Sequence, residues 1–254
     1  MSTHTPLPAR PAGPLRRAGE ARVAIWLDCR HLSPCEPVPQ PDPHTAGTVQ
    51  GVLLPGRPTL PPGADPDQIA AVLAEDRAVT TGPVNGVAGY RQAMNTALTA
   101  LETAVATGIP TPPIAIEYSP VGVDAVVDAR LDLAGSWEAK AMRGRAGLAG
   151  AHLLHAALRH DLATDRWTRL AARGARAPFL LWSTTAPSLG VDTSVGYAQR
   201  CLFPGTALAL SPAVLREFEA RGVVTGPTPL DIVEAQRIID TLGWFGVGLD
   251  TPAG

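Results

Sequence analysis

Residues 78–120 read AVTTGPVNGVAGYRQAMNTALTALETAVATGIPTPPIAIEYSP, and this stretch indicates the fold class. Two short apolar runs, AVTTGPV (78–84) and IAIEYSP (114–120), flank a segment at 88–108 whose apolar residues recur at spacings of three and four. That spacing predicts a helix, and the flanking runs predict strands. The strand residues are nearly all apolar rather than alternating with polar ones, which is typical of a parallel sheet covered on both faces.

The same alternation continues along the rest of the chain. Four more strands are predicted at 23–28, 49–56, 179–185 and 206–212, and further helices at 65–76, 213–222 and 230–246, with a long helical region from about Val123 to Arg159. About six strands therefore alternate with helices. A doubly wound sheet and a barrel share this pattern, although a barrel in its usual form has eight such units.

Composition limits the classes of function. Apolar residues make up 45% of the 254 residues, charged residues make up 17%, and the net charge of −2 argues against a nucleic-acid partner. The sequence contains no glycine-rich phosphate loop of the GxGxxG or GxxxxGK type, which weakens a nucleotide-binding interpretation. Lys140 is the single lysine beside 20 arginines, so any chemistry that needs a lysine amine would have to use it.

The N-terminal residues 1–20 are predicted to form a flexible tail, followed by one domain over 21–254 with a proline-rich loop at 31–48. Nothing resembles the apolar core of a signal peptide or a membrane span, so no membrane association is expected. Three cysteines without metal-type spacing suit a reducing cytoplasm.

A long ordered set of segments resembles the bacterial-type transaldolases. It comprises GYRQAMNTALTALETAVATG, VGVDAVVDARLDLAGSWEAKAMRGRAGLAGAHLL, DRWTRLAARGARAPFLLWSTTAP, TALALSPAVLREFEARGVVTG and LDIVEAQRIIDTLGWFGVGLD. The resemblance is close from Val79 to Asp250 and weaker at VAIWLDCRHLS. It implies an α/β (TIM) barrel, sugar-phosphate chemistry in the pentose phosphate pathway through a Schiff base on a strand lysine, and no metal or organic cofactor.

The chain departs from the family pattern where the chemistry would lie. Only about 50 residues, from Cys29 to Ala78, separate its first strand from the strand that resembles the family's fifth. The third and fourth βα units, which carry the acid–base glutamate and the Schiff-base lysine, are therefore expected to be missing. A second alignment makes VLLPGR the lysine strand and puts Leu53 at the lysine position. Both alignments lack the lysine.

Later strands have also lost polar residues that the resemblance would require. Thr80 and Gly82 stand for an asparagine and a threonine, Glu117 stands for a serine, and Gly122 stands for an arginine. Asp28 matches the family's strand-one aspartate.

Five residues remain as candidates for a site. Asp28 and Glu117 are the candidate catalytic residues, and Thr80, Ser183 and Thr184 are candidates for binding a substrate. Alternatively, Asp28 closes a buried strand by binding backbone N–H groups, while Glu117 faces a partner arginine or water.

Three other features favour a plain structural interpretation. No metal site is predicted, because no carboxylate or cysteine completes the helical histidines at 152, 155 and 160. Lys140 beside Glu138 is predicted to be a solvated surface charge, and Cys29 a buried thiol without activation.

Three hypotheses of function follow. The leading one is a degenerate transaldolase relative, a pseudoenzyme with a binding or accessory role in sugar-phosphate metabolism. It would associate with a sugar-phosphate enzyme or a second copy that covers the open barrel edge. The rival is an enzyme with a rebuilt site, in which Asp28, Glu117 and Thr80 or Tyr118 act on a small polar substrate. The third is residual transaldolase activity through an unrecognised amine.

Overall fold

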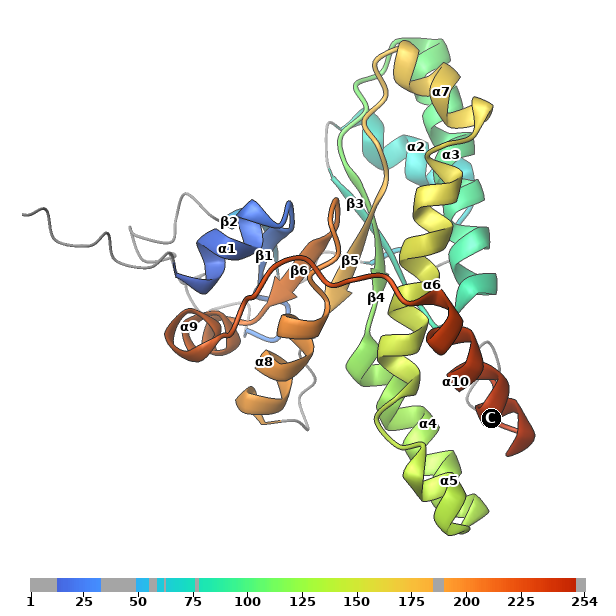
Figure 1. The fold of residues 1–254 in the computed structure, drawn as a ribbon. Helices are drawn as coiled ribbons and strands as arrows, with labels where there is room; N and C mark the ends of the chain where they lie inside the picture. Colours follow the sequence, from blue (N-terminus) through green and yellow to red (C-terminus); the bar gives the residue numbers. More distant parts are fainter. Residues whose placement is uncertain are drawn as a thin grey trace, which may run out of the picture.

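The computed structural model describes residues 13–32, 49–54, 59–61, 63–75, 78–184 and 190–249. Within these residues, six parallel strands form one curled sheet with the order β2-β1-β6-β5-β4-β3 (Figure 1). The sheet is a half-barrel, which confirms the predicted incomplete barrel. The strands are β1 (Ala24–Asp28), β2 (Val49–Leu53), β3 (Val79–Val84), β4 (Ile114–Tyr118), β5 (Phe179–Ser183) and β6 (Ala207–Leu210).

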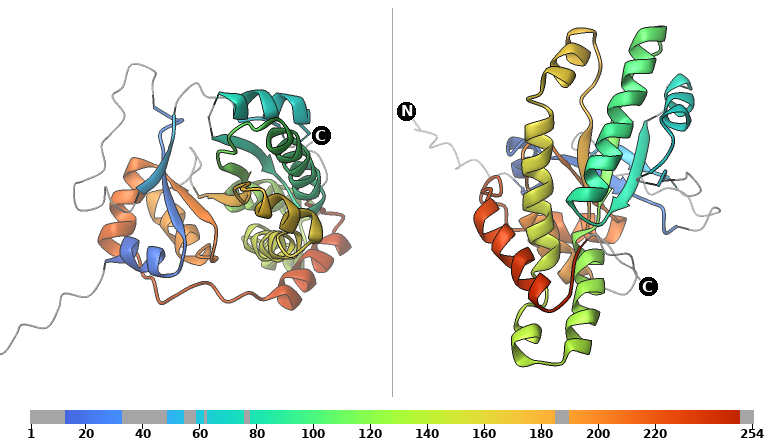
Figure 2. Two further views of the ribbon diagram at one scale, coloured as in Figure 1. Left: turned by 90° about the horizontal axis from the view of Figure 1, so that it is seen from above. Right: turned by 90° about the vertical axis from the view of Figure 1, so that its right-hand side faces the viewer.

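Helices cover the outer, convex face of the sheet. The view from above in Figure 2 shows α1, α8 and α9 at one end, and α2, α3, α6, α7 and α10 at the other. The helices are α1 (Pro14–Glu20), α2 (Pro66–Ala74), α3 (Val87–Thr107), α4 (Pro120–Ala134), α5 (Trp137–Ala141), α6 (Ala146–Asp161), α7 (Asp165–Ala172), α8 (Val191–Arg200), α9 (Pro212–Arg221) and α10 (Ile232–Trp244).

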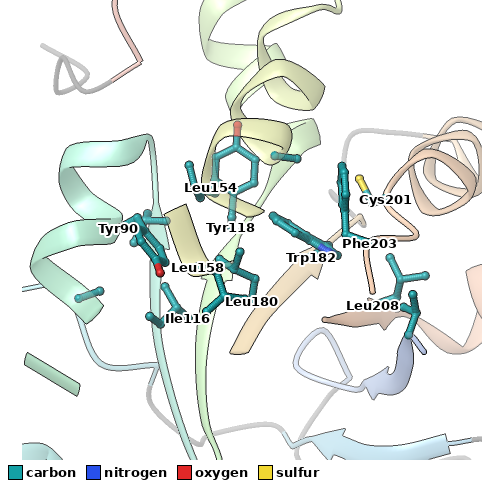
Figure 3. Packing of buried hydrophobic residues seen from close by; sticks show 14 of the residues in the cluster. Tyr90, Ile116, Tyr118, Leu154, Leu158, Leu180, Trp182, Cys201, Phe203 and Leu208 are labelled. Atoms are coloured by element: carbon teal, nitrogen blue, oxygen red, sulfur yellow. The ribbon is translucent and has the colours of Figure 1, made fainter. Parts of the chain in front are cut away.

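The main hydrophobic core lies between the convex face of the sheet and these helices. Alternate strand residues such as Tyr118, Leu180 and Trp182 point outward into it, where they meet side chains of α3 and α6 (Figure 3). The Trp182 indole donates to the hydroxyl of Thr206, so its one polar atom is bonded within the core. The strands are nearly continuously apolar because one face of the sheet packs against the helices and the other lines the interior of the half-barrel.

The opening of the half-barrel lies between β2 and β3, the two edge strands of the sheet. A short extended piece at Leu60 partly fills it by pairing in parallel with β3. The Leu60 N–H donates to Thr80 O at 2.9 Å, and Gly82 N–H donates to Leu60 O at 2.8 Å. Two prolines follow Leu60 in the sequence, and proline cannot donate to a strand ladder, which limits the pairing to this one residue.

Several sequence-based boundaries need correction. Residues 14–20, predicted as part of a flexible tail, form α1, because Leu15 and Ala18 are buried and α1 packs against α9. The continuous helical region from Val123 to Arg159 is instead divided into α4, α5 and α6 by glycines with positive φ, Gly135 at 76° and Gly144 at 68°. Helices α7 and α8 were not predicted, and most of the proline-rich loop, 33–48, lies outside the described residues.

The concave face of the sheet is lined by alanines and large apolar residues in equal number. A second, smaller cluster here consists of Leu53, Ala115, Leu181, Ala207 and Ala209, with Ala24, Trp26 and Phe179 packed against it. Gly51 lies under the Trp26 ring, and a Cβ at that position would come within 2.6 Å of the indole. The Trp26 side chain thus occupies interior space that an ordinary side chain on β2 would fill.

Candidate functional site

Three polar side chains lie at the carboxyl edge of the concave face. Asp28 is the last residue of β1, Glu117 precedes the last residue of β4, and Ser183 is the last residue of β5. Successive strand residues point to opposite faces, so each of these shares the concave face with the residue two positions earlier: Trp26, Ala115 and Leu181. Parallel strands place their carboxyl ends at one edge, which brings residues distant in sequence together.

Arg30 joins these three side chains. Its Nε and Nη2 donate to the two carboxylate oxygens of Asp28 at 3.0 and 2.8 Å. Its Nη1 and Nη2 donate to the two oxygens of Glu117, both at 2.8 Å, and Nη2 lies 3.2 Å from Ser183 Oγ. The backbone N–H of Arg30 also donates to Asp28 Oδ1 at 3.1 Å. One guanidinium therefore holds two carboxylates in paired contacts, the strongest arrangement for this group.

Burial determines the electrostatics of this cluster. The side chains of Asp28 and Glu117 are 0% and 5% exposed, and that of Arg30 is 22% exposed. Burial lowers the pKa of the Arg30 guanidinium, but the hydrogen bonds and charges of Asp28 and Glu117 outweigh it and raise that pKa above its ordinary value. Arg30 is thus a fixed cation held between two carboxyl groups.

A small pocket of about 110 Å³ adjoins Arg30 at the opening of the half-barrel. Its walls include Trp26, Leu53, Leu60 and Thr80, so they come from β1, β2, β3 and the Leu60 bridge. The volume is below the roughly 300–1,000 Å³ of typical small-molecule sites. A larger ligand would have to extend out through the opening between β2 and β3.

Comparison with known proteins adds an independent observation. No family model matches the chain. Curated transaldolases do match it: the protein of Mycolicibacterium smegmatis is 32% identical over 184 residues, that of Parafrankia sp. 33% over 185, and that of Frankia alni 31% over 188. These matches cover 71%, 71% and 72% of this chain and 50% of each relative. The chain is related to the transaldolase family.

This transaldolase relative spans about half the length of the curated relatives that it matches. The single lysine of the chain does not reach the concave face. Lys140 is exposed on α5, which lies at the far end of the α4–α6 pair from the sheet (Figure 1). Asp28, which the sequence analysis matched to the family's strand-one aspartate, pairs with Arg30 rather than with an amine.

Not all of the candidate residues join the cluster in this transaldolase relative. Thr184 is fully buried and its hydroxyl lies 3.5 Å from Ala209 O. Tyr118 points to the opposite face, where its hydroxyl donates to Gly147 O at 2.9 Å, so it does not share a site with Asp28. Thr80 lies on the wall of the small pocket that Arg30 also lines, and its side chain is not hydrogen-bonded to Arg30.

The sequence analysis missed Arg30, although a signal was available. Arg30 stands two residues after Asp28, and an extended chain returns to the same face every two residues. The sequence analysis offered a partner arginine for Glu117 as one alternative, and the structure has such a pair, but the sequence did not identify Arg30 as that arginine.

Two further features concern Cys29 and the helical histidines. Burial, and next the charge of Asp28, raise the pKa of the Cys29 thiol, which keeps it protonated. Among the described residues no cluster of three or more His, Cys, Asp or Glu side chains could hold a metal ion. His155 is buried with Nε2 3.1 Å from Pro204 O.

The helices offer no candidate for a membrane span. Across the described ranges, none is both long and apolar enough to cross a bilayer.

Proposed function

We propose that this chain is a catalytically degenerate transaldolase relative with a binding or accessory role in sugar-phosphate metabolism. The proposal rests on the hydrogen bonds of Arg30 at the concave face and on the position of the single lysine. Arg30 engages both candidate carboxylates in paired hydrogen bonds, and the only lysine lies exposed on α5. Schiff-base chemistry needs an amine with access to a carbonyl carbon, held beside a proton-transferring group.

The cluster also lacks a free general base. Both oxygens of Asp28 and both oxygens of Glu117 accept hydrogen bonds from Arg30. A base must come within about 3 Å of the proton that it removes, and here the guanidinium already occupies the approach to both carboxylates. These contacts argue against the rival hypothesis of a rebuilt acid–base site.

A trapping experiment tests whether the chain forms a Schiff base and turns over a sugar phosphate. The full chain is incubated with dihydroxyacetone, treated with borohydride and weighed intact, while a coupled assay follows turnover of fructose 6-phosphate. We expect no turnover and no adduct on Lys140. The Lys140→Arg variant is the matched control, because it keeps the charge and removes the amine. An adduct that this variant abolishes would support residual transaldolase activity, and turnover without an adduct would support a rebuilt site.

The binding role needs its own measurement. Titration of the chain with fructose 6-phosphate by calorimetry should give heat of binding without turnover. Thr80→Val removes one hydroxyl from the pocket beside Arg30 at nearly constant volume, and loss of one hydrogen bond should weaken binding by about three- to tenfold. Ser194→Ala, a buried hydroxyl away from the pocket, should leave the affinity unchanged. Absence of any binding would contradict the proposed role.

We further propose a partner at the opening between β2 and β3, either a second copy or a sugar-phosphate enzyme, and a reducing cytoplasmic location. The supporting observations are the half-barrel with its opening between those strands and the two buried free cysteines, Cys29 and Cys201. Light scattering of the purified chain over a hundredfold range of concentration tests self-association; a monomer throughout would leave only the enzyme partner.

A further inference from the structure

A second pocket lies in the helical layer, away from the concave face. It has a volume of about 360 Å³ and is formed where the beginning of α6, the end of α8 and the beginning of α10 meet. Its floor is apolar and includes Leu148 and Ile238, while Arg145 and Arg200 line it from two different helices. The size falls within the range of small-molecule sites, which combine an apolar surface with a few placed polar groups.

Arg200 is held in place by its own helix. Its Nε donates to Gly196 O at 3.2 Å, and its guanidinium carbon lies 4.9 Å from the centre of the Tyr197 ring. The Tyr197 hydroxyl in turn donates to the buried carboxylate of Asp124 at 2.6 Å, which fixes the ring. Neither Nη1 nor Nη2 has a hydrogen bond to any residue in the described part of the chain. A guanidinium held in this way presents two parallel donors, the arrangement that matches an oxyanion.

Arg145 is the second cation of the pocket. It occupies the position before the first residue of α6, and its side chain forms no hydrogen bond or ion pair with the described residues. Its charge acts on Glu234, which lines the same pocket. A bound oxyanion would give the Arg145 guanidinium the hydrogen-bonded partner that it lacks among the described residues.

The two carboxylates that line the pocket are already engaged. Asp231 Oδ1 accepts from the N–H of Glu234 and so caps α10. Both oxygens of Glu234 accept from Arg237 at 2.7 Å, in a paired contact on the outside of α10. The charge of Arg145 acts on Glu234, and that of Arg200 acts on the buried carboxylate of Asp124. Neither guanidinium is hydrogen-bonded to a carboxylate of the described residues, so both keep N–H donors available for a ligand.

His152 supplies a third donor. Its Nδ1 accepts from the N–H of Asp231 at 3.2 Å, which places the proton of the neutral ring on Nε2. Edge-to-face packing against Phe203, with ring centres 5.0 Å apart, holds the imidazole on the pocket wall.

We propose that this pocket binds a small organic oxyanion, a carboxylate or a phosphate attached to a compact apolar body. The oxyanion is held by the guanidiniums of Arg145 and Arg200, and the apolar body packs against Leu148 and Ile238. The site shares no residue with the cluster around Arg30 and does not depend on the proposed function.

Titration of the full chain with phenyl phosphate and with benzoate tests the proposal and distinguishes the two oxyanions. At least one of them should bind, and at least about tenfold more tightly than inorganic phosphate, which lacks the apolar body, or phenol, which lacks the charge. Arg145→Gln and Arg200→Gln should each weaken that binding by about tenfold or more, because a charge-assisted hydrogen bond is lost. Leu148→Ala should weaken the binding of the aromatic probes and leave the binding of inorganic phosphate unchanged.

Arg216→Gln is the matched control, since Arg216 is an exposed arginine on α9 outside the pocket. It should bind the probes as the unchanged chain does. Arg237→Gln provides a second arm: it releases Glu234, which then competes for Arg145, so binding should weaken although Arg237 itself does not line the pocket. The proposal is overturned if neither probe binds, if inorganic phosphate binds as tightly as the aromatic probes, or if Arg145→Gln and Arg200→Gln change nothing.

Discussion

At the scale of single residues, Arg30 supplies the positive charge that balances the buried carboxyl groups of the concave face. Two carboxylates without a cation would be costly to bury there, because an ionised group loses its hydration on leaving water. The guanidinium offsets this cost with four hydrogen bonds to Asp28 and Glu117, and it links β1 to β4 across the half-barrel. The same contacts that stabilise the fold occupy the groups that chemistry would need.

Replacing Arg30 should therefore destabilise the protein. Arg30→Met keeps much of the aliphatic stem but leaves Asp28 and Glu117 buried without their cation. The free energy of unfolding should fall by about 3–5 kcal/mol, the usual cost of removing one partner from a buried ion pair. Urea unfolding followed by circular dichroism measures the change.

The matched control also replaces the two carboxyl groups that Arg30→Met leaves without a cation. The triple variant Asp28→Asn, Glu117→Gln, Arg30→Met should recover most of the lost stability, because well-packed neutral groups often replace a buried ion pair at little cost. If the triple variant is as unstable as Arg30→Met alone, the ion pair is not the source of the effect.

His155 should make stability depend on pH. Burial, opposed by the contact with Pro204 O, lowers the pKa of this imidazole below the value of about 6.5 expected in the unfolded chain. Its Nδ1 has no partner among the described residues, so protonation would bury an uncompensated charge. The contribution of neutral His155 to the free energy of unfolding is then fully present above about pH 6.5. It is lost as the pH falls from that value toward the lowered pKa of the folded state.

Urea unfolding between pH 7.5 and 5 measures this dependence. His155→Phe should lose less stability on acidification than the unchanged chain, while His160→Gln, at an exposed position of the same helix, should follow the unchanged chain. Equal losses in the His155→Phe variant and the unchanged chain would mean that another group titrates.

At the scale of elements, the sequence predicts strands better than it predicts short helices. Strands β1, β4 and β5 are compact apolar runs between turn residues, and their signal survives without any knowledge of packing. Helix α1 has seven residues, two of them buried, so its stability comes from contact with α9 rather than from its own pattern. The Leu60 bridge has no sequence signal either, because the two residues between Pro58 and Pro61 are too few to show a periodicity.

Leu60→Pro tests the role of the bridge at the edge of β3. The change removes the N–H that donates to Thr80 O, and the altered backbone should also weaken the bond from Gly82 N–H to Leu60 O. We expect a loss of about 1–3 kcal/mol and faster hydrogen exchange at Gly82. Leu60→Val keeps both backbone bonds and should leave that exchange rate nearly unchanged; equal exchange in both variants would show that the bridge does not protect the edge.

At the scale of the whole molecule, topology accounts for what could be predicted of the site. Asp28, Glu117 and Ser183 lie at or next to the carboxyl ends of three parallel strands. The α/β pattern alone indicates that such residues converge at one edge. Arg30 lies beyond the strand, and its reach to Glu117, 87 positions away in the chain, depends on how the sheet curls. That curl is a property of the whole six-stranded sheet, which no local pattern records.

One continuous sheet should also make the described residues a single cooperative unit. Leu15 on α1 and Leu158 on α6 are 2% and 3% exposed and belong to the same core, although α1 packs against β1 and α6 against β5. Leu15→Ala and Leu158→Ala should each lower the free energy of unfolding by about 2–5 kcal/mol, whereas Leu133→Ala, 88% exposed, should change it little. In every variant, tryptophan fluorescence and circular dichroism should report one coincident transition. A separate early transition in Leu15→Ala, with the remainder unchanged, would show instead that the α1–α9 end unfolds as a domain of its own.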